Sequence, residues 1–520
     1  KLKEQNKLLK NNKLTHSYPH SWRSKAPLIY RATPQWFISM KKNNLRDKAV
    51  KAINQTTFYP NKGKDRLLSM VEGRPDWCVS RQRVWGVPLP IFINKKTKEP
   101  LRDEKVIDRI ASIYEKQGSD CWFTDDPKIF LGEDYSATDY EKLNDIVEVW
   151  FDSGSTHSFV LEKRKDLKWP ADMYLEGSDQ HRGWFHSSLL ESCGTRGRAP
   201  FESILSHGFV VDGKGVKMSK SMGNVISPED ILKNYGADIL RVWVASSDYA
   251  EDLRIDKSIL SQHAESYRKI RNTFRFILGN LKDEFVKQDF KKIKTNEFDE
   301  LEQFILHKLY LMGLSVEENL RNYNFHKLYK ELLNFCTLEL SSFYFDIRKD
   351  VLYCDSLNSK KRKDCVIVLN IILESLLKWF APILVFTTEE IFDLISKSND
   401  SIHESTFVKI PENWKNEKIN LKWFNLYKIK QEANVAIEEK RSKKVIGSSL
   451  EAEIKIFTDK KNFELLDNLN LSEYFITSKA ERVLSEKEEM KVEVKKADGK
   501  KCERCWKILE KKCDRLECPI

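Results

Sequence analysis

No unbroken apolar run in the sequence approaches the roughly 20 residues that a membrane-spanning helix needs. The first residues, Lys1–Asn6, are polar and of mixed charge, so they do not resemble the apolar core of a secretory signal. We therefore expect a soluble, cytoplasmic protein without a membrane partner. An initiating methionine is also missing, and we expect the chain to begin inside a longer polypeptide.

Closely spaced cysteines are absent from most of the chain. Six of the ten cysteines are scattered singly over the first 365 residues, as expected of reduced thiols. The other four crowd into the C-terminal end, which suggests a metal site. Cys502 and Cys505 have the spacing of a zinc-knuckle half-site, and Cys518 begins a second one just before the chain stops. Cys513 is either a spare thiol or a substitute ligand.

The length and the charge limit the architecture and the partners. A chain of 520 residues is too long for one core, so we expect three or four domains. The net charge of +11 is compatible with a polyanionic partner but does not prove one, because lysine is abundant throughout.

The most informative stretch is a loop that presents two lysines between a strand and a helix. A short apolar strand is predicted over 204–211, and glycines at 213–215 begin a loop that holds Lys217 and Lys220. A helix is predicted over 227–236, with a capping serine, proline at its first position and glycine at its end. Two flexible ammonium groups suit a polyphosphate. The alternative is a lysine-rich surface loop.

Two predicted strands end in small polar groups. The strand over 146–150 is followed by Phe-Asp-Ser-Gly-Ser, and the strand over 173–178 is followed by a helix over 179–190. Open α/β sheets bind ligands at such carboxyl ends. Gly177 would let the backbone approach a nucleotide, and Asp179 would accept from ribose hydroxyls. The same pattern also caps many purely structural helices.

The segments around these strands are less specific. Arg81 and Arg83 flank a glutamine, and they would either hold a phosphate or a tRNA end or pair with carboxylates inside the domain. Residues 94–145 are polar with weak apolar periodicity, which indicates an inserted subdomain.

The second half of the sequence is predicted to be mainly helical. Helical periodicity over 258–281, 299–323, 325–349 and 363–397, the last interrupted by Ala381-Pro382, predicts an antiparallel bundle from about 257 to 400. A further charged helix over 421–443 and a strand over 445–457 predict a small α/β module.

Three arginines share one face of the first bundle helix. Arg268, Arg271 and Arg275 have the spacing to follow a phosphate backbone, so they are candidates for tRNA binding. An ordinary solvated helix face explains them equally well.

Three sequence motifs together resemble a known family. They are Lys217-Met218-Ser219-Lys220-Ser221, Trp150-Phe-Asp-Ser-Gly-Ser155 and Tyr174-Leu-Glu-Gly-Ser-Asp-Gln-His-Arg-Gly-Trp-Phe185. The first resembles the ATP-binding "KMSKS" loop of class I aminoacyl-tRNA synthetases. The combination is similar to bacterial-type isoleucyl-tRNA synthetases, and the similarity extends from about Tyr18 to Pro519.

The resemblance implies a domain order. Residues 1–30 would end an editing insertion, and 31–256 would form the C-terminal half of a Rossmann-like α/β catalytic domain, with 94–145 inserted. An all-α anticodon-binding bundle would occupy 257–420, followed by a small α/β junction module over 421–500 and the start of a zinc knuckle over 501–520. The histidine-bearing "HIGH" turn and the editing core would lie outside this chain.

The resemblance also implies an activity. The full-length enzyme would activate isoleucine with ATP and Mg²⁺, transfer it to tRNA(Ile) and edit valine, whereas the present chain alone would be nearly inactive. We expect a monomer with one structural Zn²⁺, whose last ligand would lie just beyond Ile520. A valyl or leucyl synthetase, or a non-catalytic tRNA-binding fragment, is the alternative.

Roles follow for the matching residues. Lys220, and secondarily Lys217, would stabilise the pyrophosphate, and Trp150 and Trp184 would line the isoleucine pocket. The expected ATP and adenylate contacts are Glu176, Gly177, Asp179, Gln180, Phe209, Val210 and Lys220.

Overall fold

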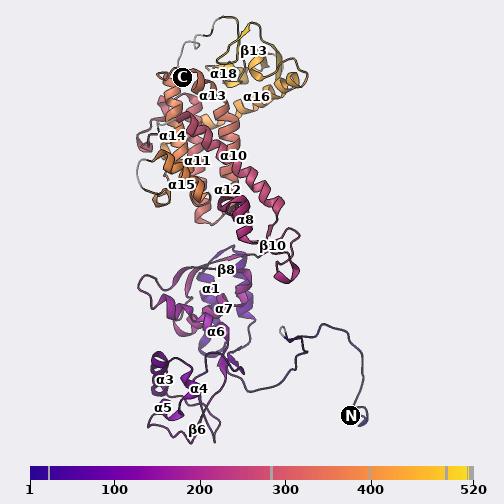
Figure 1. The fold of residues 1–520 in the computed structure, drawn as a ribbon, viewed down its shortest axis with the longest axis vertical. Helices are drawn as coiled ribbons and strands as arrows, with labels where there is room; N and C mark the ends of the chain where they lie inside the picture. The colour runs from indigo at the N-terminus through magenta and orange to yellow at the C-terminus, as the bar shows by residue number, and fades with distance from the viewer. Residues whose placement is uncertain (22–23, 282–284, 397–399, 486–489, 512, 514–520) are drawn as a thin grey trace. The chain divides into compact units, whose positions relative to one another are not determined.

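The computed structural model describes residues 1–520 except 22–23, 282–284, 397–399, 486–489, 512 and 514–520. The chain forms two compact units, 1–206 and 207–520, and each is described by itself (Figure 1). No helix in the described part of the chain combines the length and the apolarity that crossing a bilayer requires.

The first unit is built on a small sheet with the strand order β2-β9-β8, in which β2 and β9 are parallel. These strands are β2 (Thr57–Tyr59), β8 (Ala171–Gly177) and β9 (Phe201–His207). The helices whose apolar side chains share the core with the sheet are α1 (Leu45–Gln55), α2 (Lys62–Glu72) and α7 (Trp184–Thr195). In α7 every residue from Phe185 to Cys193 is buried. This helix is therefore the centre of the unit.

Two predictions in this region are wrong in detail. The strand predicted over 146–150 is only β7 (Ile146–Val147), and Val149–Gly154 is a helix, α6. The strand stops because its partner β4 (Ser80–Arg81) offers only two residues for pairing. The helix predicted over 179–190 is divided at Gly183 into the 3-10 helix η3 (Ser178–Arg182) and α7.

The segment predicted as an insertion has a core of its own, in which Trp122 is fully buried between Phe92 and Phe130. Its elements are β5 (Phe92–Asn94), α3 (Glu104–Gln117), α4 (Cys121–Thr124), α5 (Pro127–Leu131) and β6 (Tyr140–Lys142). Strands β5 and β6 are antiparallel. The remaining strands of the unit, β1 (Phe37–Ile38) and β3 (Trp77–Cys78), pair with each other.

The second unit begins with the loop that carries Lys217 and Lys220, which we call the lysine loop. The strand predicted over 204–211 is divided, because Gly208 separates β9 from β10 (Val210–Asp212). A Cβ at Gly208 would lie 2.3 Å from the carbonyl oxygen of Glu251, so the backbones touch there. Strand β10 is parallel to β11 (Leu253–Ile255).

The helix predicted after the loop is confirmed as α8 (Pro228–Tyr235). The Ser227 side chain accepts from the Glu229 N–H, and Gly236 ends the helix with φ +85°. Helix α9 (Ala237–Ser246) follows and leads toward the bundle.

The bundle matches the predicted helices closely, and Figure 1 shows its long helices packed side by side. The helices are α10 (Lys257–Leu281), α11 (Glu300–Arg321), α12 (Phe325–Asn334), α13 (Asp346–Cys354), α14 (Lys360–Phe380) and α15 (Val385–Ile395). A π-helical segment, Phe335–Phe345, connects α12 to α13, so the helix predicted over 325–349 continues to Cys354. The break at Ala381-Pro382 is confirmed.

The C-terminal module contains a three-stranded sheet of order β13-β12-β14, with β13 parallel and β14 antiparallel to β12. Its elements are α16 (Glu417–Ser442), β12 (Ala452–Thr458), α17 (Lys460–Leu465), α18 (Leu471–Tyr474), β13 (Lys479–Leu484), β14 (Lys491–Lys496), β15 (Lys500–Lys501) and β16 (Ile508–Leu509). One hydrophobic core extends from Val242 through the bundle to Val494. The bundle and the module therefore share their interior.

Candidate active site

Two tryptophans and a glutamine gather around Gly183, the break between η3 and α7. A Cβ at Gly183 would lie 2.4 Å from Gln180 Oε1 and 2.8 Å from Trp150 Cη2, so only glycine fits. The Trp184 N–H donates to Gln180 Oε1 (3.0 Å), and Trp184 Nε1 donates to the Ser153 carbonyl (2.9 Å). Both predicted pocket tryptophans thus lie close together, in the first turns of α6 and α7.

The Trp184 ring is held in position by stacking on a neighbouring aromatic ring. The rings of Tyr174 and Trp184 are parallel, with centroids 4.0 Å apart. Trp150 remains 38% exposed, so one side of the tryptophan pair is open to a ligand. An apolar wall with one open side suits a small aliphatic group.

The acidic groups at the end of β8 face solvent. Glu176 and Asp179 are exposed, and neither forms an ion pair with any described residue. Gln180 donates to Asp179 Oδ2 (3.3 Å), and Gly177 at the end of the strand is buried. The two carboxylates are therefore available to hydroxyl or ammonium donors of a ligand.

Two buried histidines close to Gly183, His181 and His186, were not among the site residues predicted from the sequence. His181 Nδ1 lies 2.8 Å from the Ser178 carbonyl, and burial lowers its pKa. Burial, reinforced by the charges of Arg74 and Arg182, lowers the pKa of His186 to about 3. Both imidazoles are therefore neutral near pH 7, and they support the η3–α7 turn without adding charge. The position of His181 within the motif, two residues after Asp179, was the feature of the sequence that could have identified it.

The side chains of Asp212 and Asn224 form a polar latch that holds the lysine loop. The sequence analysis did not predict this latch. Asp212 accepts from the N–H groups of Lys214 (3.0 Å) and Val216 (2.8 Å) through Oδ1, and from Asn224 Nδ2 (2.9 Å) through Oδ2. Asn224 Oδ1 accepts from the Ser219 N–H (2.9 Å). The two side chains therefore tie the start of the loop to its end. Their signal in the sequence was an Asp and an Asn at the two borders of a glycine-rich loop.

Within this latched loop the two lysines remain free. Lys217 and Lys220 are exposed, and neither forms an ion pair with a described residue. Met218 between them packs partly against the cluster that includes Ile231 and Trp243. The loop therefore has a buried anchor and two ammonium groups that can neutralise a polyanion.

The backbone expected to meet adenine is partly occupied. The Phe209 N–H donates to Asp252 Oδ1 (2.8 Å), and the Phe209 carbonyl accepts from the Leu253 N–H (2.8 Å). Both Phe209 and Val210 are 43% exposed. The Phe209 N–H is therefore already bonded to a side chain of the protein.

The arginines considered from the sequence differ in their surroundings. Arg81 pairs with Glu148 (3.0 Å) and donates to backbone carbonyls, which fits the structural alternative, whereas Arg83 is exposed. On α10, Arg268 pairs with Glu265, and Arg271 pairs with Glu390 (3.2 Å).

The third arginine on this helix, Arg275, is exposed. All three lie outside the buried face of α10, as the helical period predicts.

Three C-terminal thiols converge. The sulfur atoms of Cys502, Cys505 and Cys513 all lie within 4.8 Å of one another, and all three residues are buried. Because a tetrahedral zinc site has Zn–S distances of about 2.3 Å, three thiols at this separation fit one zinc ion. Cys513 therefore belongs to the cluster, and the predicted ligand Cys518 lies outside the described residues.

Family models match most of this architecture. Residues 3–256 match the class I tRNA synthetases for I, L, M and V, and residues 302–456 match the anticodon-binding domain of tRNA ligases. The chain belongs to the class I tRNA synthetases.

Within that family its sequence is similar to isoleucine–tRNA ligases, which confirms the resemblance found in the motifs. It is 66% identical to the isoleucine–tRNA ligase of Pelagibacter ubique over 99% of this chain and 57% of the relative. It is 45% identical to that of Zymomonas mobilis over 98% of this chain and 55% of the relative. The chain thus spans somewhat more than half the length of these curated relatives.

Solved structures support the fold. A Mycobacterium tuberculosis methionyl-tRNA synthetase bound by methionyl-adenylate aligns with a TM-score of 0.52 and 15% identity, over 74% of this chain and 68% of that one. A second structure of a Mycobacterium tuberculosis methionyl-tRNA synthetase, in complex with methionyl-adenylate, gives 0.51 over the same shares.

Proposed function

We propose that the full-length protein activates isoleucine with ATP and transfers it to tRNA(Ile), and that this chain supplies the lysine loop, part of the catalytic sheet and the anticodon-binding region. The proposal rests on the latched loop, in which Lys217 and Lys220 are exposed and unpaired among the described residues. The similarity to isoleucine–tRNA ligases supports the choice of amino acid.

The first step forms a mixed anhydride. The isoleucine carboxylate attacks the α-phosphorus of ATP, an O–P bond forms, and the bond to the leaving pyrophosphate breaks. Such a reaction depends mainly on positioning and on neutralising negative charge. Lys220, assisted by Lys217, would take up the charge that develops on the pyrophosphate. Mg²⁺ bound with ATP would share that charge.

The tip of β8 and the tryptophans would hold the reactants. Asp179 would accept from the ribose hydroxyls, and Glu176 would receive either the substrate ammonium or a ribose hydroxyl. Gly177 and Gln180 would contact the adenylate beside them. Trp150 and Trp184 would enclose the aliphatic side chain. Because a missing methylene changes apolar binding only modestly, valine would also enter, and its removal would need an editing domain of the full-length protein.

The second unit would bind the tRNA. Its match to the anticodon-binding domain of tRNA ligases supports this assignment. Arg275 and, after exchange of their carboxylate partners, Arg268 and Arg271 would contact phosphates. Cys502, Cys505 and Cys513 would hold one Zn²⁺ that fixes the C-terminal turn.

Pyrophosphate exchange tests the proposal. The full-length protein should exchange pyrophosphate into ATP when isoleucine is present, and Lys220→Ala should lower the rate at least about a hundredfold. Lys214→Ala, in the same exposed loop, is the matched control and should retain most of the rate. The 520-residue chain alone should be nearly inert.

Other outcomes would select an alternative. Exchange with valine or leucine in preference to isoleucine would assign a related synthetase. Binding of tRNA without exchange of any amino acid would leave an RNA-binding protein and contradict the proposed activity.

A further inference from the structure

Glu148 is the residue before α6, and all of its polar atoms are bonded within the first unit. Its N–H donates to the Val79 carbonyl (2.8 Å), and its carbonyl accepts from the Phe151 N–H (2.9 Å) in the first turn of the helix. Its carboxylate accepts from Trp77 Nε1 through Oε2 (2.6 Å) and pairs with Arg81 Nη2 through Oε1 (3.0 Å). The side chain is 14% exposed, so water screens these bonds little. Together they fix the point at which α6 begins.

Trp77 extends this attachment along α6. Its ring packs against the ring of Phe151, with centroids 5.9 Å apart, and the residue is 4% exposed. Phe151 directly follows Trp150 in the helix. The backbone of Trp150 therefore lies between two attached residues, Glu148 before it and Phe151 after it.

Arg74 connects the same indole ring to α7. The Arg74 guanidinium carbon lies 5.4 Å from the centroid of the Trp77 ring, and Nη1 lies 3.4 Å from His186 Nδ1. Because arginine can only donate, His186 Nδ1 is the acceptor, which agrees with an uncharged imidazole. Burial lowers the pKa of Arg74, and the negative charge of Glu148 opposes this shift. His186 follows Trp184 by two residues on α7, so these contacts reach both tryptophans of the predicted pocket.

We call Arg74, Trp77, Arg81 and Glu148 the Glu148 network. We propose that Glu148 is a positioning residue, which through this network sets the separation of Trp150 and Trp184 and thereby the fit of an aliphatic side chain between them. The inference rests on the proposed function, because it concerns the amino-acid pocket. Trp184 also donates to the Ser153 carbonyl of α6, so a shift of α6 would change both walls of the pocket. The ion pair of Arg81 with Glu148 thus acts on the substrate without touching it.

Glu148→Gln in the full-length protein tests the inference by pyrophosphate exchange. Glutamine keeps the size of the side chain, but one of its two polar atoms can no longer accept from Trp77 or Arg81. The KM for isoleucine should rise by about fivefold, because the aliphatic side chain loses burial in a looser pocket. The kcat should stay within about twofold, because the lysine loop has its own latch. Selectivity, the kcat/KM for isoleucine over that for valine, should fall by about threefold to fourfold, the value of one buried methylene.

Arg81→Met is the second variant. It removes the cation at a side chain that is 35% exposed, so it carries the test by itself if Glu148→Gln does not fold. It should raise KM and lower selectivity as Glu148→Gln does. In the double variant the two effects on KM should not add, because both changes break the same ion pair.

Glu162→Gln is the matched control, since it removes an ion pair with Arg196 (2.7 Å) at the other end of α7 from Trp184. It should change neither KM nor selectivity. An unchanged KM and selectivity in Glu148→Gln and Arg81→Met, whatever their kcat, would overturn the inference while exchange by the parent protein stays intact. The same shift in Glu162→Gln would also overturn it, because any loosening of the unit would then suffice. A parent protein without isoleucine-dependent exchange would contradict the proposed function itself, and this inference with it.

Discussion

Glu191 on α7 is a buried carboxyl group that forms no ion pair with any described residue. It lies against Gly154, where an added Cβ would be 2.2 Å from Glu191 Oε1, and that oxygen has no partner among the described residues. Burial, reinforced by the charge of Asp152, raises the pKa of Glu191 to about 9, whereas Arg196 opposes the shift. At neutral pH the group is therefore protonated in the folded chain.

A pH dependence of stability follows from this residue. The folded pKa lies above the unfolded value, so the folded chain holds a proton that the unfolded chain releases, and stability falls as pH rises toward 9. Glu191→Gln removes this contribution. The melting temperature of the variant relative to the parent should therefore rise between pH 6.5 and pH 8.5.

Glu202→Gln, at an exposed ion pair with Arg198, is the control and should show little change over that range. A constant difference between Glu191→Gln and the parent would mean that Glu191 is ionised in the folded chain.

At the scale of elements, the lysine loop depends on its latch. Asn224→Ala removes the bonds to Asp212 and to the Ser219 N–H, so the loop should sample many conformations. In the 520-residue chain, trypsin should cleave after Lys217 and Lys220 faster than in the parent. In the full-length protein, pyrophosphate exchange should fall by about tenfold or more, because ordering the loop then opposes binding.

Asn234→Ala provides the comparison for that experiment. Asn234 is an exposed residue of α8 whose side chain donates to the Asp230 carbonyl, within the same helix. Its substitution should alter neither tryptic cleavage in the loop nor exchange. Identical cleavage of the Asn224→Ala and parent chains would show that the latch does not restrain the loop.

The elements that the sequence predicted well are those with local determinants. Helix α8 has its cap, its proline and its terminal glycine within ten residues, and the long bundle helices have clear apolar periods. The end of β7 depends instead on a two-residue partner far away in the chain, and the split at Gly183 depends on the Trp150 ring. Such tertiary contacts leave no local pattern.

The candidate site divides in the same way. The tryptophans, the lysines and the strand-tip acids were identified from motifs, and Trp150, Gln180 and Trp184 do lie together. The Asp212–Asn224 latch was missed, and the choice between the two alternatives for Cys513 stayed open, because each depends on how a loop closes in space. Spacing alone identifies half-sites such as Cys502–Cys505 but not their partners.

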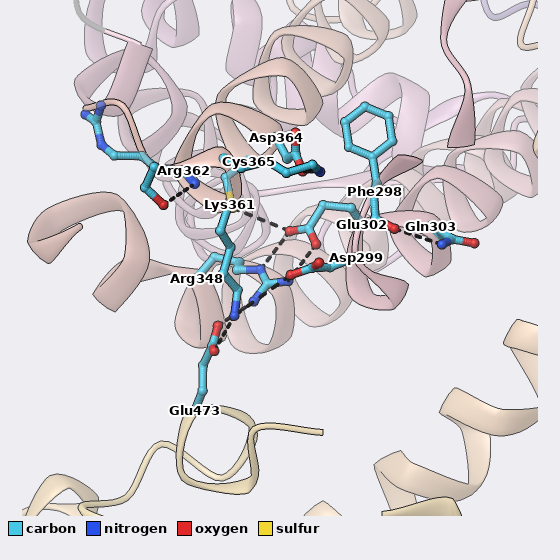
Figure 2. A network of polar contacts seen from close by, with 12 residues as sticks. Phe298, Asp299, Glu302, Gln303, Arg348, Lys361, Arg362, Asp364, Cys365 and Glu473 are labelled. Atoms are coloured by element: carbon cyan, nitrogen blue, oxygen red, sulfur yellow. Dashed lines mark hydrogen bonds and ion pairs between the residues drawn. The ribbon is translucent and has the colours of Figure 1, made fainter. Parts of the chain in front are cut away.

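At the scale of the whole molecule, the buried network of Figure 2 connects the bundle to the module. Arg348→Leu would leave Glu302 and Glu473 buried without their main cation, and it should lower the free energy of unfolding by about 3–5 kcal/mol in denaturant titrations. Replacing both acids with glutamine in the same chain should restore most of that loss.

Arg268→Leu, which removes only an exposed pair with Glu265, should change the free energy by less than about 1 kcal/mol. A similarly small effect for Arg348→Leu would show that the network contributes little to the junction.

The unbroken interior from Val242 to Val494 determines how a destabilising substitution would affect this protein in the cell. A packing defect anywhere along it raises the unfolded population of the whole second unit, and cellular proteases remove unfolded chains. Substitutions far from every ligand, such as Leu376→Ala in the middle of α14, would therefore reduce the amount of protein in the cell while each surviving molecule works at its normal rate.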